Sequence, residues 1–409
     1  MSASSDNELP PGEKVRLGPL GPQVVRVAGA IGVIFLIATV ILGLTNGDHM
    51  RRFFHSYLIG FTYFVTLGLG ALFFILLHHI TRTKWGVTSR RIAECITGVF
   101  PLLFVLSFVL LLPLLLGHES FYSWSNHDFV AHHEAMEHKT AWLNAPFFAL
   151  RVVLYFGVWM ALSRYFFKKS VGQDASGDPA ASDQMRRAAG PALFAFGLTL
   201  NFFAWDVLMS LEPEWYSTMY GVYFFGGCGV MFYAALALSS MGLRRRGIAA
   251  KSITVEHYHD MGKMLFAFIF FWAYIAFSQF MLIWYGNIPE ETAYYNVRIM
   301  TDWKWISLAL LFLHWMIPFT FLLSRHTKRR LPLLALFSVW MLVMHWVDVY
   351  WLVMPAYSPG GMAFSVMDIT ATLGIGGLAV ATVAKLASGV DIIPTKDPLL
   401  GESLRFENM

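Results

Sequence analysis

Ten long apolar stretches alternate with short polar segments along the chain, and each is long enough to cross a bilayer. A transmembrane helix needs about 20 mostly apolar residues, because in lipid every backbone polar group must be satisfied within the helix. The predicted spans cover residues 24–46, 56–80, 91–116, 143–167, 187–209, 216–242, 261–286, 302–324, 331–354 and 362–386. The pattern therefore predicts an all-α polytopic membrane protein with ten transmembrane helices.

Basic residues collect on one side of these spans. Of the 30 lysines and arginines, 24 fall in the N-terminal tail, the even-numbered loops and the C-terminal tail; five fall on the other side, and Arg151 lies within a span. Cytoplasmic loops carry an excess of Lys and Arg, so both termini are expected in the cytoplasm. The net charge of +4 reflects this orientation and does not indicate nucleic-acid binding.

The composition excludes an ordinary soluble domain, since 56% of residues are hydrophobic, 14% are charged and the mean hydropathy is +0.55. The polar segment 170–185 is expected to be a flexible linker. Cys95 and Cys228 both fall within predicted spans, so the sequence contains no disulfide framework, CxxC metal site or CxxCH haem attachment. We therefore expect no cysteine-ligated redox centre in this chain.

An internal repeat organises the spans. The second span contains Gly60 and Gly68, and the sixth contains Gly221 and Gly229 at a displacement of 161 positions. Aromatic residues within these spans, and a Leu-Ser-Arg triplet at the ends of spans four and eight, repeat at the same displacement. Spans two to five and six to nine are therefore predicted to form two four-helix bundles related by a pseudo-twofold axis along the membrane normal. The alternative is chance similarity among aromatic-rich apolar segments.

The predicted organisation follows from this repeat. It comprises a cytoplasmic N-terminal tail (1–23), a first flanking helix with its external loop (24–55), the two four-helix bundles (56–209 and 210–354), a second flanking helix (355–386) and a cytoplasmic C-terminal tail (387–409).

Polar side chains within the spans mark the candidate functional region. A charged side chain at the centre of a transmembrane helix costs roughly 3 kcal/mol or more, so those retained usually pair, line a cavity or relay protons. An outer group is expected in the outer half of the bilayer: Arg151, Asp206, Gln279, His314, His345, Asp348 and Asp368. An inner group is expected near the cytoplasmic ends: His78, His79, Glu94, His259, Asp260 and Lys263. Two groups at opposite depths indicate an outer site approached by a proton path from inside.

Each group has a structural alternative. His78 and His79 could simply sit among lipid headgroups, and Glu94 and Asp260 could form helix-end ion pairs with neighbouring arginines or Lys263. His345 and Asp348 are spaced i, i+3 on one helical face, which suits a proton-exchanging pair. For Arg151 and Asp206, the sequence leaves open a buried structural pair and, together with His314 and Gln279, a quinone-binding site.

Two metal-centred alternatives remain. The external segment 117–140 contains five histidines with acidic neighbours, and His132 with Met136, and His133 with Glu137, would share helical faces. Because spacing alone supplies no third and fourth ligand, the interpretation favoured for this segment is a docking surface for another subunit. His314 and His345 fall at similar depths in neighbouring spans, which is the spacing that a b-type haem would need, but the sequence contains no second matched pair.

Several blocks resemble the NrfD-like (PsrC-like) family of membrane subunits, and more narrowly the second, ActF-type subunit of bacterial alternative complex III. They are Trp205-Asp206 with Met209 to Pro213 and Trp215, Gly221 to Phe225, Leu143 to Phe148, Phe271 to Tyr285, Asn287 to Thr292, and Pro394 with Asp397-Pro398. The resemblance extends over all ten spans, and the block in the seventh span is long and specific.

This resemblance implies a subunit of a quinol:cytochrome c oxidoreductase in the bacterial inner membrane. The family fold is two four-helix bundles with two flanking helices. The implied partners are a sister NrfD-like membrane subunit, periplasmic iron-sulfur and multihaem cytochrome c subunits, and a terminal oxidase. Haem and iron-sulfur centres are then in the partners, this chain binds no covalent cofactor, and quinol is oxidised mainly at the sister subunit.

The expected function is therefore anchoring of the redox subunits together with proton conduction coupled to quinol oxidation. The proposed path has His78, His79, Glu94 and Asp260 at its inner approach; Asp206, His345, Asp348 and Asp368 lie near its outer end. A purely structural anchor and a secondary ion transporter are the alternatives. Spans unbroken by midplane Gly/Pro interruptions weigh against the transporter.

Overall fold

The computed structural model describes residues 8–48, 50–117, 122–133, 136 and 138–408. It is all-α, with 78% of the chain in helices and ten helices long and apolar enough to cross a membrane, which confirms the predicted fold class. The spans are α1 (Leu20–Thr45), α2 (Arg51–Thr81), α3 with α4 (Val87–Leu115), α7 (Ala145–Ser176), α8 with its continuation (Ala180–Leu211), α9 (Tyr220–Arg245), α10 (Val255–Gly286), the eighth span (Lys304–Leu323), α15 (Leu331–Tyr357) and α16 (Val366–Ala387).

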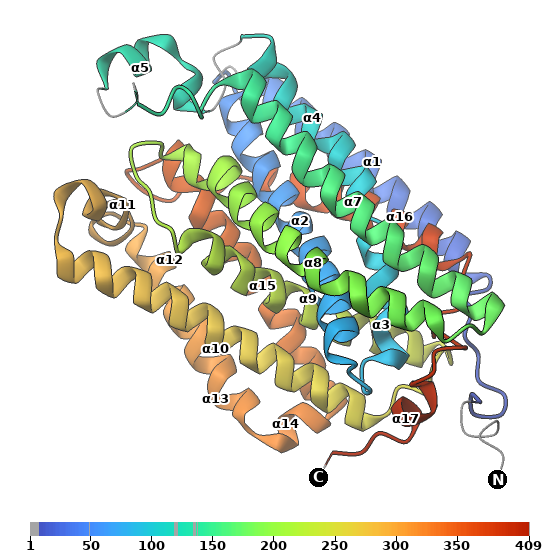
Figure 1. Ribbon diagram of the computed structural model, residues 1–409. Coiled ribbons are helices and arrows are strands. Elements are labelled where there is room, and N and C mark those ends of the chain that lie inside the picture. The colour runs from blue at the N-terminus through green and yellow to red at the C-terminus, as the bar shows by residue number, and fades with distance from the viewer. Residues whose placement is uncertain (1–7, 49, 118–121, 134–135, 137, 409) are drawn as a thin grey trace.

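Short helices lie between and after the spans. They are η1 (Ser123–Ser125), α5 (His127–His132), α11 (Pro289–Met300), α14 (Arg325–Arg329) and α17 (Leu400–Leu404). The first and last described segments of the chain, before α1 and after α16, lie at one end of the bundle, and α5 and α11 lie toward the other (Figure 1). We call the end with these segments the inner end and the opposite one the outer end. The even number of spans accounts for this arrangement.

Helix α2 is the centre of the molecule. Of its most apolar window, 89% is buried, against 17% for α1. Helix α2 packs with α3, α4, α7 and α8, while α9 packs with α10 and α15, and α10 with the eighth span. The two groups meet where α2 contacts α9 and α15. At Gly70 of α2, an added Cβ would lie 2.2 Å from the carbonyl oxygen of Cys228 in α9, so glycine permits this close approach.

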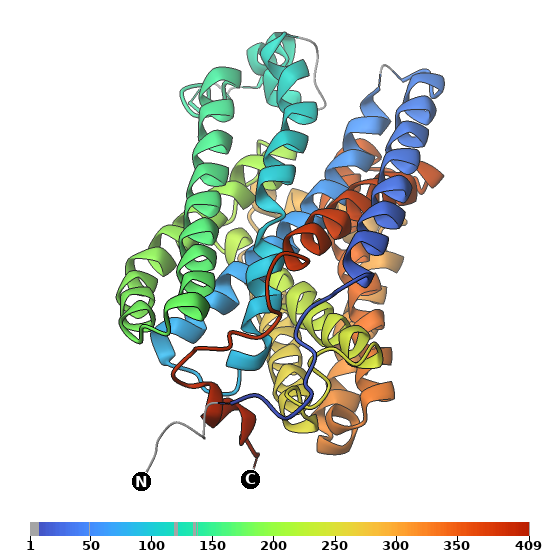
Figure 2. The ribbon, with the colours of Figure 1, turned by 90° about the vertical axis from the view of Figure 1, so that its right-hand side faces the viewer.

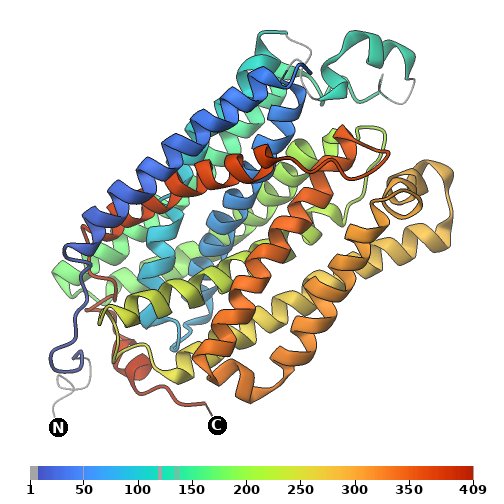
Figure 3. The same ribbon diagram turned by 180° about the vertical axis from the view of Figure 1, so that it is seen from behind.

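Helices α1 and α16 form a pair outside the two groups and cross each other closely (Figures 2 and 3). At Gly377 an added Cβ would lie 2.5 Å from the backbone nitrogen of Gly32 and 2.6 Å from the carbonyl oxygen of Ala28. Small residues at a helix crossing let backbones approach, which is the usual means of association in lipid. Helix α16 in turn packs on α2 and so attaches the pair to the core.

The predicted flexible linker over 170–185 is much shorter in the structure, because helix occupies most of it. Helix α7 continues to Ser176, and α8 begins at Ala180. Gly177 ends α7 with a positive φ of 68°, as expected for a glycine after a helix. The side chain of Gln173 then closes the turn by donating to the carbonyl oxygen of Asp178 at 3.0 Å and to the Ser182 hydroxyl at 2.8 Å. Local polar residues thus stabilise the helix ends beyond the apolar run.

Within the described residues, two spans contain a π-helical segment, one in the outer part of the fifth span and one near the middle of the eighth. One covers Ala204–Leu208 (η2) in the fifth span, followed by the 3-10 turn η3 (Met209–Leu211). The other covers Leu310–Met316 (η4) in the eighth span, between α12 (Lys304–Ala309) and α13 (Ile317–Leu323). Such segments are rare and often occur at functional sites. They contain Asp206 and His314, two of the polar residues singled out in the sequence.

Candidate functional site

Arg151 of α7 and Asp206 of η2 form a closed ion pair. The Asp206 carboxylate accepts from Arg151 Nε at 2.7 Å and Nη2 at 3.0 Å, so the contact is bidentate. Trp142 Nε1 and the Tyr155 hydroxyl donate to the same carboxylate at 2.9 and 2.5 Å. Arg151 is 4% exposed and Asp206 is 1% exposed. Since both carboxylate oxygens are occupied, this geometry is that of the structural pair.

Asp368 is closed in the same way at the outer end of α16. It forms an ion pair with Arg52 at the start of α2, and both side chains are buried. The Ser56 hydroxyl donates to Asp368 Oδ1 at 2.6 Å, and the backbone N–H of Ser365 donates to Oδ2 at 2.9 Å. This pair could not be predicted from the sequence, because Arg52 falls in the external segment between the predicted spans 24–46 and 56–80.

Glu94 lies between two arginines at the inner end. Its Oε1 accepts from Arg90 Nε at 3.2 Å and its Oε2 from Arg91 Nε at 2.7 Å. Arg90 also donates to Asp397 at 2.6 Å, and Arg91 donates to Asp174 at 2.8 Å. These charges form one buried network that ties α3 to α7 and to the C-terminal segment.

The remaining inner residues differ from one another. His78 and His79 are buried, at 5% and 6% exposure, and so lie within the bundle and not among headgroups. The Nδ1 atom of His78 lies 2.7 Å from the carbonyl oxygen of Phe74, whereas the Nε2 atoms of both histidines have no hydrogen-bond partner among the described residues. Asp260 pairs with Lys263 one turn along α10. This pair is the helix-end contact that the sequence offered as an alternative.

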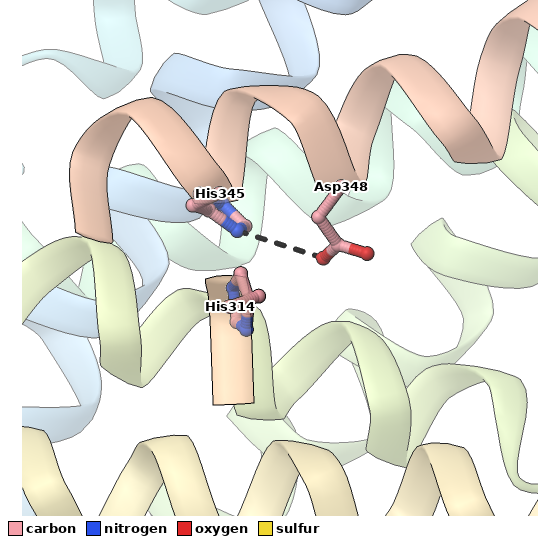
Figure 4. A group of neighbouring side chains, drawn as sticks. All are labelled: His314, His345 and Asp348. Atoms are coloured by element: carbon pink, nitrogen blue, oxygen red, sulfur yellow. Dashed lines mark ion pairs between the residues drawn. The ribbon is translucent and has the colours of Figure 1, made fainter. Parts of the chain in front are cut away.

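Asp348 of α15 has no lysine or arginine partner in the described chain, whereas the other buried carboxylates there each have one. Those carboxylates are Glu94, Asp206, Asp260, Asp368 and Asp397. The Tyr223 hydroxyl of α9 donates to Asp348 Oδ1, and Trp272 Nε1 of α10 donates to Oδ2 at 3.2 Å. His345, one turn away, places Nδ1 at 3.7 Å from Oδ2. Both His345 and Asp348 are 1% exposed. The carboxylate is therefore held by two neutral donors. It faces the imidazole of His345 (Figure 4).

Thr66 of α2 sets the tautomer of His345. The Thr66 hydroxyl donates to the carbonyl oxygen of Tyr63 at 2.7 Å, so its oxygen accepts from His345 Nε2 at 2.9 Å. In neutral His345 the other nitrogen, Nδ1, is then an acceptor, and it faces an acceptor oxygen of Asp348. One proton placed between the two atoms replaces this repulsion with attraction. The His345–Asp348 pair is therefore suited to take up and release a proton.

His314 completes the group, which we call the His–Asp cluster (His314, His345 and Asp348). It extends from η4 toward the other two residues (Figure 4), and neither of its ring nitrogens has a hydrogen-bond partner within the described residues. The Trp272 ring packs against its face with ring centroids 4.0 Å apart. The ligand atoms of the cluster lie within 4.8 Å of one another. Zinc bonds of about 2.0–2.2 Å would require ligand atoms roughly 3.4 Å apart, so metal binding would need side-chain movement.

A cavity of about 530 Å³ lies beside the cluster, bounded by α9, α10, α11, the eighth span and α15. Tyr223 and Trp272, the two donors to Asp348, also line this cavity. Its few other polar groups include Gln279, which donates to the Tyr295 hydroxyl at 2.8 Å. Burial raises the pKa of Tyr295 to about 12, so this phenol stays protonated at neutral pH. An apolar, aromatic cavity with a few fixed polar groups is typical of a small-molecule site.

The candidate residues of the outer group therefore do not form one site. The structure brings together His314, His345 and Asp348 and places Gln279 on the adjoining cavity, whereas Arg151 and Asp206 form their own pair. The sequence reasoning missed Tyr223, Trp272 and Thr66. Tyr223 and Trp272 belong to blocks that carry the family resemblance, but nothing in the sequence indicated that their polar atoms point at Asp348.

The external histidines make local contacts. The Nδ1 atoms of His132 and His133 each lie 2.7 Å from the backbone carbonyl four residues earlier. His133 Nε2 lies 3.8 Å from a carboxylate oxygen of Glu214. His118 and Glu137, which belonged to the proposed metal-binding pattern, lie outside the described residues.

No protein-family model matches the chain, and no curated protein matches it. The ten spans define an integral multi-pass membrane protein.

Proposed function

We propose that this protein is the non-haem membrane subunit of a quinol:cytochrome c oxidoreductase complex in a bacterial inner membrane. It anchors iron-sulfur and multihaem subunits at its outer end, beside a sister membrane subunit, and it moves protons coupled to quinol oxidation. The sequence blocks that resemble NrfD-like subunits support the class of complex, and the His–Asp cluster supports the proton role.

One observation carries the proton role. Asp206, Asp368 and Glu94 each pair with buried arginine, whereas Asp348 is held by neutral donors and faces His345. A fixed cation beside a buried carboxylate stabilises the charged form and so opposes protonation. Asp348 has no such cation in the described chain, and a proton would relieve both the burial of its charge and its contact with His345 Nδ1. We therefore route protons through His345 and Asp348 and treat the other three carboxylates as structural.

The cavity next to Tyr223 and Trp272 supports access of a quinol to the cluster. Oxidation of a quinol to a quinone releases two electrons and two protons. The electrons pass to redox centres of partner subunits at the outer end, and the protons need acceptors near the quinol hydroxyls. Aromatic walls accommodate the flat ring, and Gln279 with Tyr295 supplies hydrogen-bonding groups.

We place a route toward the inner end along α15. Ser338 lies seven residues before His345, on the same face of the helix, and its buried hydroxyl has no partner within the described part of the chain. Asp260, His78 and His79 would then form the inner approach. This route supports exchange of protons between the cluster and the inner side.

The test is the Asp348→Asn variant in the purified complex, reconstituted into liposomes and supplied with quinol and cytochrome c. We expect fewer protons moved per electron, while electron transfer continues, because the amide does not titrate. Its single oxygen can still accept from one of the two donors, Tyr223 or Trp272. Asp302→Asn makes the same chemical change at the exposed outer surface and serves as the control.

An unchanged proton-to-electron ratio in Asp348→Asn, with the complex intact, would contradict the proton role. The protein would then be a structural anchor, the alternative that the three closed ion pairs favour. If the Asp348→Asn complex does not assemble, the same measurement is made on Tyr223→Phe. This variant removes one donor and leaves the carboxylate in place.

A further inference from the structure

A second cavity, of about 540 Å³, lies in the inner half of the bundle between the α1–α16 pair and the faces of α2, α3 and α9. Its walls are almost wholly aliphatic and aromatic, with Leu20, Leu67, Ile96 and Val383 among them. It is separate from the cavity beside Gln279 and shares no lining residue with it. Nothing in the proposed proton chemistry uses this space.

The cavity has the depth of one leaflet. Its wall on α9 runs from Met231 to Leu243, a rise of about 18 Å along the helix at 1.5 Å per residue. One leaflet of bilayer hydrocarbon is about 15 Å thick. The lining residues Leu17, Leu243 and Ile392 lie at the inner end, and Tyr63 lies near the middle of α2. The space therefore extends from the inner boundary to the bilayer centre.

Positive charges adjoin the lining residues at the inner end. Arg245 and Arg246 lie two and three residues after Leu243, the last lining residue of α9, and Lys385 lies between the lining residues Ala384 and Ala387 of α16. All three are exposed, and none of their side chains has an ion-pair or hydrogen-bond partner within residues 8–408 as far as these are described. In contrast, Arg16 in the same region already pairs with Asp391 at 2.6 Å.

We propose that this cavity binds an anionic phospholipid of the inner leaflet. An acyl chain fills the apolar space, and the phosphate-bearing headgroup rests among Arg245, Arg246 and Lys385. Basic pockets between helix ends on the cytoplasmic side are a recurrent way of binding anionic headgroups. An uncharged lipid or a quinone tail would use the apolar walls but gain nothing from the three cations.

The bound chain would also close the space beneath the His–Asp cluster. Tyr63 lines the deep end of the cavity, and its ring lies against that of His345 with centroids 5.6 Å apart. A chain that ends there keeps water in the cavity from reaching His345. Lipid binding is independent of the proposed redox role and can be measured without electron transfer.

The experiment measures lipid retention by native mass spectrometry. The protein, purified with the subunits that accompany it, is delipidated in detergent and titrated with dioleoyl phosphatidylglycerol or dioleoyl phosphatidylcholine. We expect tighter binding of phosphatidylglycerol, and roughly 30-fold weaker binding of it in Arg245→Gln/Arg246→Gln. The control is Lys168→Gln/Arg187→Gln, which removes the same charge from inner-end residues of α7 and α8 that do not line the cavity. This variant should bind phosphatidylglycerol as tightly as the wild-type protein does.

A second variant tests the cavity itself. Ala235→Phe places a ring among the lining residues and should abolish retention, whereas Ala161→Phe on the exposed face of α7 should not. Equal affinity for the two lipids in the wild-type protein would overturn the proposal, and this comparison needs no variant to fold. Unchanged binding in Arg245→Gln/Arg246→Gln would do the same. Either result leaves the outcome of the Asp348→Asn experiment unaffected.

Discussion

Removing one partner of the Arg151–Asp206 pair should be far more damaging than removing both. In Asp206→Asn, the buried guanidinium of Arg151 loses its counter-ion, and a neutral amide replaces an acceptor of four hydrogen bonds. Uncompensated buried charge of this kind costs about 3–5 kcal/mol. The remaining acceptor for Arg151 is the carbonyl oxygen of Trp142 at 2.9 Å, which cannot neutralise the charge.

The double variant Arg151→Met/Asp206→Leu removes both charges and keeps similar side-chain volume. Replacing a buried ion pair by apolar residues is often neutral, so we expect most of the lost stability to return. The assay is reversible unfolding of the purified protein in mixed micelles, with both single variants and the double variant forming a double-mutant cycle. The expected coupling energy is several kcal/mol.

Two results would refute this reasoning. A loss below about 1 kcal/mol in Asp206→Asn would mean that water reaches the pair and screens it, as at an exposed ion pair. A double variant as unstable as the single one would mean that packing, not unbalanced charge, determines the loss. An altered proton-to-electron ratio in a folded Asp206→Asn complex would return Asp206 to the proton path.

Two further predictions concern glycines. Gly227→Ala places a Cβ 2.7 Å from His345 Cε1 and 3.2 Å from Nδ1, so we expect reduced proton movement per electron in an assembled complex; a normal ratio would mean that the position of His345 is unimportant. Gly377→Val should separate α1 from α16 and lower the melting temperature of the purified protein, because its Cβ would meet Gly32 and Ala28. Gly197→Val, where no neighbouring atom lies within 4 Å, is the control, and equal melting temperatures for the two variants would contradict this packing argument.

The ten spans could be predicted from the sequence, because hydrophobicity over about 20 residues is a direct consequence of the bilayer. Their ends could not, as 170–185 shows: helix there depends on the Gln173 contacts and on Gly177, which hydropathy does not register. The relation between Gly60, Gly68, Gly221 and Gly229 indicated that α2 and α9 are equivalent. It did not reveal that these helices contact each other.

The candidate site was predictable only where its residues share a helix. The i, i+3 spacing identified His345 and Asp348, since helical geometry alone places them together. Tyr223 and Trp272 lie 125 and 76 positions from Asp348, and only tertiary packing brings them to its carboxylate. Arg52 and Asp368 are 316 positions apart, so their ion pair could not be predicted from the sequence either. This pair occupies a carboxylate that was expected to belong to the proton path.

The central claim is that Asp348 changes its protonation state during quinol oxidation. Infrared difference spectroscopy of the intact complex, recorded between the states before and after quinol addition, measures this change directly. We predict a carboxylic-acid C=O band that shifts in D₂O and disappears in Asp348→Asn. The same difference spectrum with no carboxylic-acid band, or with a band that persists unchanged in Asp348→Asn, would contradict the account.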